Sequence, residues 1–173
     1  MGVTPPLAII QARLHSTRLP EKLLLDVRGH PLLWWGWAMA ASLLGSENVV
    51  IACPADDVVE FQLALPDATI FGWPGLEEDV LGRLHACAHA YRSDPRSLLC
   101  RVTPDDFPID LTREVLNLDF LDRFHEETTD ATDREHVGRL FDRRVEVNTW
   151  RDVEAVRLKV SNARLWDEQS HER

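Results

Sequence analysis

The chain has 173 residues, 45% of them hydrophobic and 28% charged, a composition typical of one folded domain and not of a disordered chain. Its 29 acidic and 19 basic residues give a formal net charge of −10, which excludes an extended nucleic-acid-binding surface because such a surface must be basic. The longest apolar stretch, 31–45, is shorter than the roughly 18 residues of a membrane span, and the first ten residues lack the basic start of a signal peptide. We therefore expect one domain over 1–173, cytoplasmic, with neither nucleic acid nor membrane among its partners.

Apolar runs of strand length alternate with longer segments of helical character. Strands are predicted at 7–12, 48–52, 68–72, 97–103 and 144–148, and helices at 30–45, 55–64, 78–92, 111–127, 133–141 and 150–158. Such alternation is the pattern of βα units, so the predicted fold is an α/β, Rossmann-like three-layer domain with a mostly parallel central sheet. Ligands of open sheets bind beyond the carboxyl ends of the strands, which directs attention to the loops at 12–22, 103–110 and 148–152.

The loop after the first predicted strand is basic, although the protein as a whole is acidic. Its polar residues are Arg13, Ser16, Thr17, Arg18 and Lys22. Guanidinium groups chelate two phosphate oxygens and an ammonium group acts as a mobile point charge, so this set suits a polyphosphate. The loop is not a P-loop, because the GxxxxGK[ST] pattern is absent. A solvated basic loop would show the same charge pattern.

Five segments, in chain order, have the character of family motifs. They are QARLHSTRLPEKLLLDVRGHPLL at 11–33, GLEEDVLGRLHACAHAY at 75–91, CRVTPDDFPID at 100–110, TDREHV at 132–137 and VEVNTWRDVEAVR at 145–157. This series resembles the motifs of the cytidylyltransferases of the spore-coat polysaccharide and acylneuraminate/KDO type. The resemblance implies a fold of the nucleotide-diphosphosugar transferase type. It also implies transfer of a nucleotidyl group from CTP to a sugar or sugar acid, with release of pyrophosphate, in cell-surface polysaccharide biosynthesis. It leaves a homodimer open.

The resemblance also assigns roles to residues. Arg13, Ser16, Thr17 and Lys22 would bind the triphosphate, with Arg18 assisting. Arg13, Lys22 and Asp105 are the predicted catalytic residues: the two cations would neutralise charge on the phosphoryl oxygens and the leaving pyrophosphate, and Asp105 would hold the metal. Mg²⁺ is the expected cofactor, with Asp105 as its main ligand, Asp106 as the substitute and Asn148 on the opposite side. Glu78, Asp79 and Arg83 would lie near the nucleotide, although Glu78 and Asp79 equally suit the first turn of a helix.

Within the five motifs, the chain departs from the family pattern at four positions. His15, Glu21 and Pro104 stand where the pattern has glycine, and Asn148 stands where it has aspartate. A side chain in place of glycine can obstruct a phosphate, and asparagine brings no charge to a metal. The strand-rich section that follows the third motif is missing or reduced to LNLDF at 116–120. Two alternatives therefore stay open: a non-catalytic nucleotide-binding or assembly subunit, and transfer involving a different nucleotide or acceptor.

Other candidate residues favour structural roles. Cys53, Cys87 and Cys100 are odd in number and widely spaced, which indicates buried thiols. His85 and His89 are four residues apart and could bind zinc, but the HExxH pattern is absent and Cys87 points elsewhere on the helix. Thr132 and Glu135 have the spacing of a capping box, which accounts for Glu135 and leaves His136 unassigned.

Overall fold

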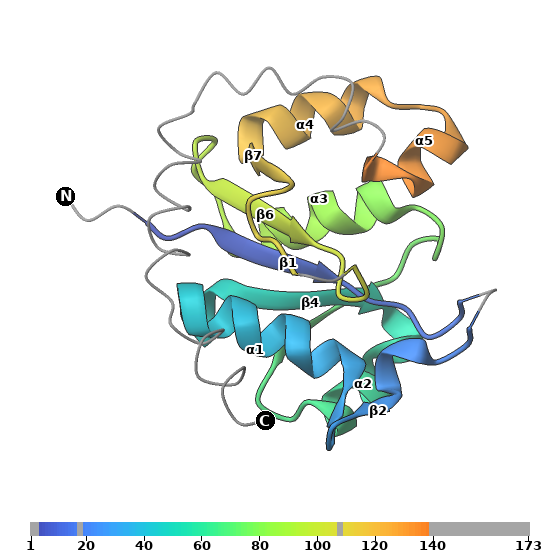
Figure 1. Ribbon diagram of the computed structural model, residues 1–173. Coiled ribbons are helices and arrows are strands. Elements are labelled where there is room, and N and C mark those ends of the chain that lie inside the picture. The colour runs from blue at the N-terminus through green and yellow to red at the C-terminus, as the bar shows by residue number, and fades with distance from the viewer. Residues whose placement is uncertain (1–3, 17–18, 107–108, 139–173) are drawn as a thin grey trace.

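The structure, a computed structural model, describes residues 4–16, 19–106 and 109–138. Within them, a five-stranded sheet has the order β5-β4-β1-β6-β7 (Figure 1). Four strands are parallel: β1 (Leu7–Gln11), β4 (Val49–Pro54), β5 (Thr69–Trp73) and β6 (Leu98–Val102). The edge strand β7 (Val115–Asn117) is antiparallel to β6. A short hairpin of β2 (Asp26–Val27) and β3 (His30–Pro31) lies outside this sheet.

Helices cover both faces of the sheet, so the predicted three-layer α/β architecture is confirmed (Figure 1). On one face lie α1 (Leu32–Leu44) and α2 (Val58–Ala64), and on the other lie α3 (Val80–Tyr91) and α4 (Leu118–Glu127). The short helix α5 (Ala131–Glu135) contacts α3. Single 3₁₀ turns occur at η1 (Lys22–Leu24), η2 (Ser46–Asn48) and η3 (Ala55–Asp57).

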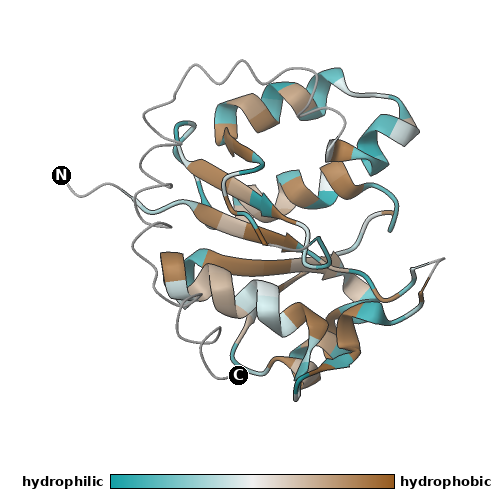
Figure 2. Ribbon diagram, viewed as in Figure 1, coloured by the Kyte–Doolittle hydropathy of each residue, from teal (hydrophilic) through white to brown (hydrophobic). Residues whose placement is uncertain are grey.

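The hydrophobic core is divided between the two faces of the sheet. Ala8 and Ile10 of β1 pack with α1 and α2, whereas Leu7 and Ile9 pack with α3 and α4, because successive side chains of a strand point to opposite faces. Burial on both faces explains why the inner strands β1 and β4 are nearly continuous apolar runs. In Figure 2 the central strands are brown, and much of the surface of α4 and α5 is teal.

Two sequence predictions at the carboxyl half are wrong. The helix predicted at 111–127 begins only at Leu118, since Val115, Leu116 and Asn117 pair with β6 and form the edge of the sheet. A helix is present in the region predicted at 133–141, but its predicted start and cap are wrong. It begins at Ala131, because Asp130, and not Thr132, caps it by accepting hydrogen bonds from the amides of Thr132 and Asp133. Positions 139–141 lie outside the described residues. The elements predicted at 144–148 and 150–158 lie outside the described residues.

The strand order places a topological switch point beside β1. The chain proceeds from β1 to β4 and β5 on one side, and then returns to place β6 on the other side of β1. In open α/β sheets the carboxyl ends of two such strands border the ligand-binding crevice. The expected site therefore lies beyond Gln11 and Val102.

Two further expectations concern the three cysteines and the possibility of a membrane-spanning helix. Cys53, Cys87 and Cys100, all within the described part of the chain, are buried free thiols as predicted. Among the described residues, no helix has the length and apolar character that crossing a membrane requires.

Candidate functional site

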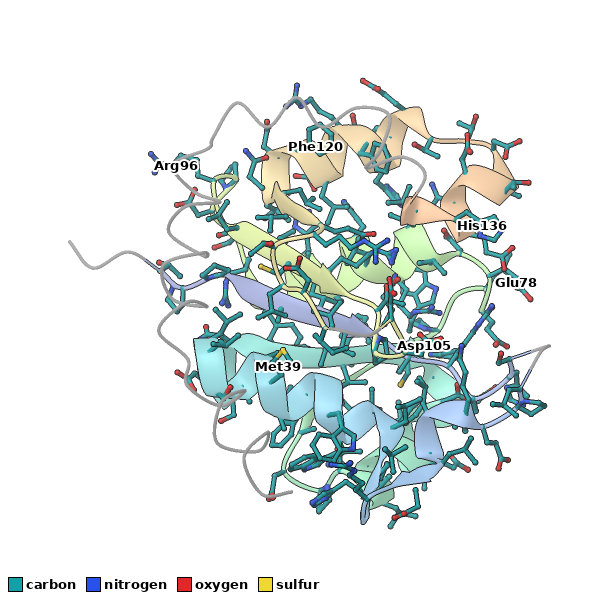
Figure 3. All side chains as sticks on the ribbon, viewed as in Figure 1. Met39, Glu78, Arg96, Asp105, Phe120 and His136 are labelled. Atoms are coloured by element: carbon teal, nitrogen blue, oxygen red, sulfur yellow. The ribbon has the colours of Figure 1, made fainter. Side chains whose placement is uncertain are left out.

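A cavity of about 260 Å³ opens beyond the carboxyl ends of β1 and β6, at the switch point. Five of the residues singled out in the sequence line it: Arg13, Ser16, Lys22, Arg83 and Asp105. The other lining residues are Gln11, Ala12, Leu23, Val80, Thr103, Glu135 and His136. Figure 3 shows Asp105 and His136 on the side of the molecule where the parallel strands end. Segments from Gln11 to His136, far apart in the chain, thus line one cavity.

The basic loop after β1 is held by hydrogen bonds that involve its own backbone. The Leu14 amide donates to the carboxylate of the buried Asp57 at 2.9 Å, and the Glu21 amide donates to the Leu14 carbonyl at 2.8 Å. These bonds close the loop and start η1 at Lys22. Asp57, which follows β4, is therefore a positioning residue that the sequence analysis missed. Its place directly after a strand end is the signal that could have found it.

Glu21 stands where the family pattern has glycine, and its backbone is in the left-handed conformation that glycine adopts more readily than other residues. Its φ is 55° and its ψ is 18°, in the left-handed region that a side chain disfavours. The departure at Glu21 therefore carries backbone strain, and it places a carboxylate next to Lys22. His15, the other departure in this loop, has a largely exposed side chain, with Nδ1 at 3.9 Å from carboxylate oxygens of Asp57 and Glu77.

Arg83 is a buried cation at the inner wall of the cavity. It is 2% exposed and lies in the second turn of α3. One terminal nitrogen donates to the Glu77 carbonyl at 3.0 Å, but Nε has no hydrogen-bond partner among the described residues. Burial lowers the pKa of Arg83 from its ordinary value, which means that the folded protein disfavours this charge. A buried donor without a partner, beside a cavity, is a group that an anionic ligand would satisfy.

Asp105 follows β6 and faces the basic loop across the cavity. Its carboxylate forms an ion pair with the Lys22 ammonium group, so residues 83 positions apart lie in contact. Pro104, which replaces the family's glycine, is buried against α1, where a Cβ at Gly36 would lie 3.4 Å from the Pro104 Cβ. Pro104 therefore packs in ordinary van der Waals contact with α1 at Gly36. Asp106 forms a separate ion pair with Arg113 and does not line the cavity.

Asp79 has a structural environment outside the cavity lining. It caps α3 by accepting a hydrogen bond from the Gly82 amide at 2.9 Å, and it forms a two-point ion pair with Arg134 at 2.9 and 3.0 Å. Partial burial would raise the pKa of Asp79, but the hydrogen bonds from Arg134 and Gly82 outweigh it and hold the pKa below its ordinary value. The pair joins α3 to α5. Glu78 is exposed.

Glu135 and His136 belong to the cavity, which the sequence analysis did not predict. Glu135 is not a capping-box residue: its carboxylate lies 3.8 Å from an Arg13 terminal nitrogen and lines the cavity. The signal was present, since both residues belong to the TDREHV motif. Thr17, Arg18 and Asn148 lie outside the described residues.

The gathered groups define what the cavity can bind. Arg13, Lys22 and Arg83 supply three cations, and Asp105 and Glu135 supply two carboxylates. Cations neutralise phosphate oxygens, and carboxylates are ligands for a hard divalent ion such as Mg²⁺. Together with the switch-point location, the set defines an α/β protein with a site suited to a polyphosphate and a divalent cation.

Comparison with known proteins places the chain within this class. The profile of the cytidylyltransferase family matches residues 7–156. The chain belongs to the cytidylyltransferase family, as the five motifs predicted.

Two curated proteins are similar to part of the chain. The chain is 42% identical over 62 residues to a 3-deoxy-manno-octulosonate cytidylyltransferase of Acidobacterium capsulatum, and 44% identical over 52 residues to that of Chlorobium chlorochromatii. These matches cover 35% and 30% of this chain, but only 25% and 21% of the relatives. The chain thus matches no more than a quarter of the length of these relatives.

Solved structures support the fold. A cytidylyltransferase from Leptospira borgpetersenii superposes with a TM-score of 0.68 at 21% identity, covering 81% of this chain and 71% of that one. A CMP:2-keto-3-deoxy-manno-octonic acid synthetase complexed with CTP superposes with a TM-score of 0.52 at 22% identity, covering 71% and 48%. The chain therefore shares its Rossmann-like α/β fold with these solved structures.

Proposed function

We propose that this protein transfers a cytidylyl group from CTP to a sugar acid of the 3-deoxy-manno-octulosonate kind, releasing pyrophosphate, as a cytoplasmic step in cell-surface polysaccharide biosynthesis. The observation that carries the proposal is the convergence of Arg13, Lys22, Arg83 and Asp105 on one switch-point cavity. Membership of the cytidylyltransferase family supports CTP as the donor. The names of the similar relatives support the acceptor.

The chemistry requires positioning and charge neutralisation more than covalent catalysis. A hydroxyl oxygen of the acceptor attacks the α-phosphorus of CTP, and the bond from that phosphorus to the α–β bridging oxygen breaks. Negative charge grows on the leaving pyrophosphate, where Arg13 and Lys22 would neutralise it. The Arg83 Nε, unpartnered among the described residues, would donate to a phosphate oxygen. Binding of the nucleotide would separate Lys22 from Asp105.

Mg²⁺ fits the donor set of the cavity. Magnesium is commonly held by one or two carboxylates together with substrate phosphate oxygens. Asp105 would hold it, with the Glu135 carboxylate on the same cavity wall as Arg13 available nearby. Bound Mg²⁺ supplies charge neutralisation to the phosphates. Asn148, which lies outside the described residues, is the other proposed ligand, through its amide oxygen.

The test is a coupled pyrophosphate-release assay with CTP, Mg²⁺ and 3-deoxy-manno-octulosonate. Wild-type protein should release pyrophosphate only with both substrates. Lys22→Ala and Asp105→Asn should each lower the rate at least tenfold, since each removes one charge from the reacting groups. Arg96→Ala is the matched control, because Arg96 is exposed and pairs with Asp94 on the opposite side of the molecule (Figure 3).

Three results would contradict parts of the proposal. Undiminished turnover in both variants would show that the assigned site is wrong. Mg²⁺-dependent CTP binding without turnover, measured by calorimetry and with a panel of sugar acids, would instead favour the non-catalytic nucleotide-binding subunit. A preference for UTP, GTP or ATP over CTP would overturn the choice of donor.

A further inference from the structure

A second cluster of metal-ligating side chains lies between α3 and α4, and none of its members lines the cavity. His85 and His89 project from one face of α3, and Asp122 reaches them from α4. Their Nε2 atoms lie 3.1 Å and 2.6 Å from the same oxygen, Asp122 Oδ1. The spacing of His85 and His89 predicts two ligands for one metal ion, but the sequence does not indicate a third ligand. The packing of α4 against α3 supplies the carboxylate.

The hydrogen bonds of the cluster indicate which ring nitrogens carry protons. A carboxylate only accepts hydrogen bonds, so both Nε2 atoms carry their protons in this geometry. The neighbouring His125 ring stacks on the His85 ring, with 4.1 Å between the ring centroids. The His125 Nε2 accepts a hydrogen bond from Arg134 at 3.0 Å, and an accepting ring nitrogen carries no proton, so His125 is neutral in this geometry. Neutral imidazole is the form that binds a metal.

We propose that His85, His89 and Asp122 bind a divalent transition-metal ion of the Zn²⁺ type, which clamps α3 to α4. Two imidazoles and a carboxylate favour Zn²⁺, Ni²⁺ or Co²⁺ over Mg²⁺ and Ca²⁺, which prefer oxygen ligands. The metal takes the place of the two Nε2 protons, and each neutral ring then carries its proton on Nδ1. Water completes the coordination, since His89 is exposed to solvent.

The distances allow coordination with small side-chain movements. The three ligand atoms lie within 4.8 Å of one another. Ligands bound tetrahedrally at the usual zinc distances lie about 3.3 Å apart. The side chains of His89 and Asp122 are 42% and 37% exposed, so they are free to rotate into that arrangement. The proposal does not depend on the nucleotide chemistry of the cavity.

The test is calorimetric titration of the full-length, nucleotide-free and Mg²⁺-free protein with ZnCl₂. Wild-type protein should bind about one Zn²⁺ per chain, and an excess of a hundredfold over Kd should raise Tm by about 5–10 °C. His89→Ala and Asp122→Asn should each weaken binding at least tenfold, because even the loss of an outer-shell partner commonly costs 10–100-fold. His30→Ala and Asp119→Asn, which replace exposed residues of the same types elsewhere, should bind as wild type.

A second measurement needs no variant and so does not depend on folding of the mutants. In the wild-type protein, ZnCl₂ should shift the Nε2 resonances of His85 and His89 in a ¹⁵N NMR spectrum, and leave those of His30 in place. Absence of Zn²⁺ binding would overturn the proposal. Zn²⁺ binding that persists unchanged in both His89→Ala and Asp122→Asn, or that leaves the His85 and His89 resonances unmoved, would overturn it as well.

Discussion

Replacement of Arg83 by methionine separates its role in nucleotide binding from its role in stability. Methionine has a similar length and fills the space of the aliphatic stem, but it carries no charge. The Arg83 side chain is 98% buried, and its Nε has no partner among the described residues. If that nitrogen donates a hydrogen bond to a phosphate oxygen of bound CTP, the substitution must weaken CTP binding far more than it lowers the free energy of unfolding.

The expected magnitudes follow from these contacts. A hydrogen bond to a charged group contributes about 1.5–3 kcal/mol, so loss of the Arg83 bond to CTP should raise Kd roughly 10- to 150-fold. The free energy of unfolding should change by no more than about 1 kcal/mol. Loss of the bond to the Glu77 carbonyl, whose donor is also charged, costs about 1.5–3 kcal/mol, and removal of a buried charge that burial disfavours offsets most of that loss.

Calorimetric titration with CTP and Mg²⁺, together with urea unfolding of the free protein, measures both quantities. Arg92→Met is the matched control. Arg92 follows the last residue of the same helix and also has a buried Nε without a partner in the described part of the chain, but it does not line the cavity. Unchanged CTP affinity in Arg83→Met would refute the assignment. A loss of more than about 3 kcal/mol of stability would show that Arg83 mainly balances Glu77 and Asp57 in the folded protein.

Three further predictions address the structure around the site. Glu21→Gly should raise the free energy of unfolding by up to about 1 kcal/mol in urea titrations, because it relieves a left-handed φ of 55°. Arg134→Ala should cost about 1–3 kcal/mol at pH 7, and the difference from wild type should shrink as the pH falls below 3.8, since the pKa of Asp79 is lowered and its pair is lost on protonation. Iodoacetamide at pH 8 should label the cysteines only after denaturation, because burial raises the pKa of each thiol to about 12.

Each of these predictions has a contrary outcome. A lower unfolding midpoint for Glu21→Gly would mean that the glutamate side chain makes a stabilising contact worth more than the strain. A gap between Arg134→Ala and wild type that stays constant down to pH 3 would mean that Arg134 stabilises the protein through its bonds to backbone carbonyls and not through Asp79. Rapid labelling of the folded protein would place a thiol at the surface.

The four parallel strands of the sheet were predictable from the local sequence. The apolar runs at 7–12, 48–52, 68–72 and 97–103 match the four parallel strands to within two residues at each end. A strand that is buried on both faces must be apolar throughout, so its position can be predicted from the sequence. The basic loop and Asp105 were predictable for a related reason, since polar residues directly after such strands lie at the ligand-binding edge of the sheet.

Tertiary structure alone decided which distant residues meet. Val115–Asn117 is a strand because β6 offers it an edge, although the local pattern favoured a helix. Asp57 fixes the basic loop, Glu135 faces Arg13, and Asp122 completes a set with His85 and His89 only because separate elements pack side by side. The spacing of apolar residues in the sequence indicates which side of a single helix or strand is buried, because the geometry of that element repeats regularly. Contacts between elements depend on how the sheet is ordered and how its helices pack, and no local pattern encodes that.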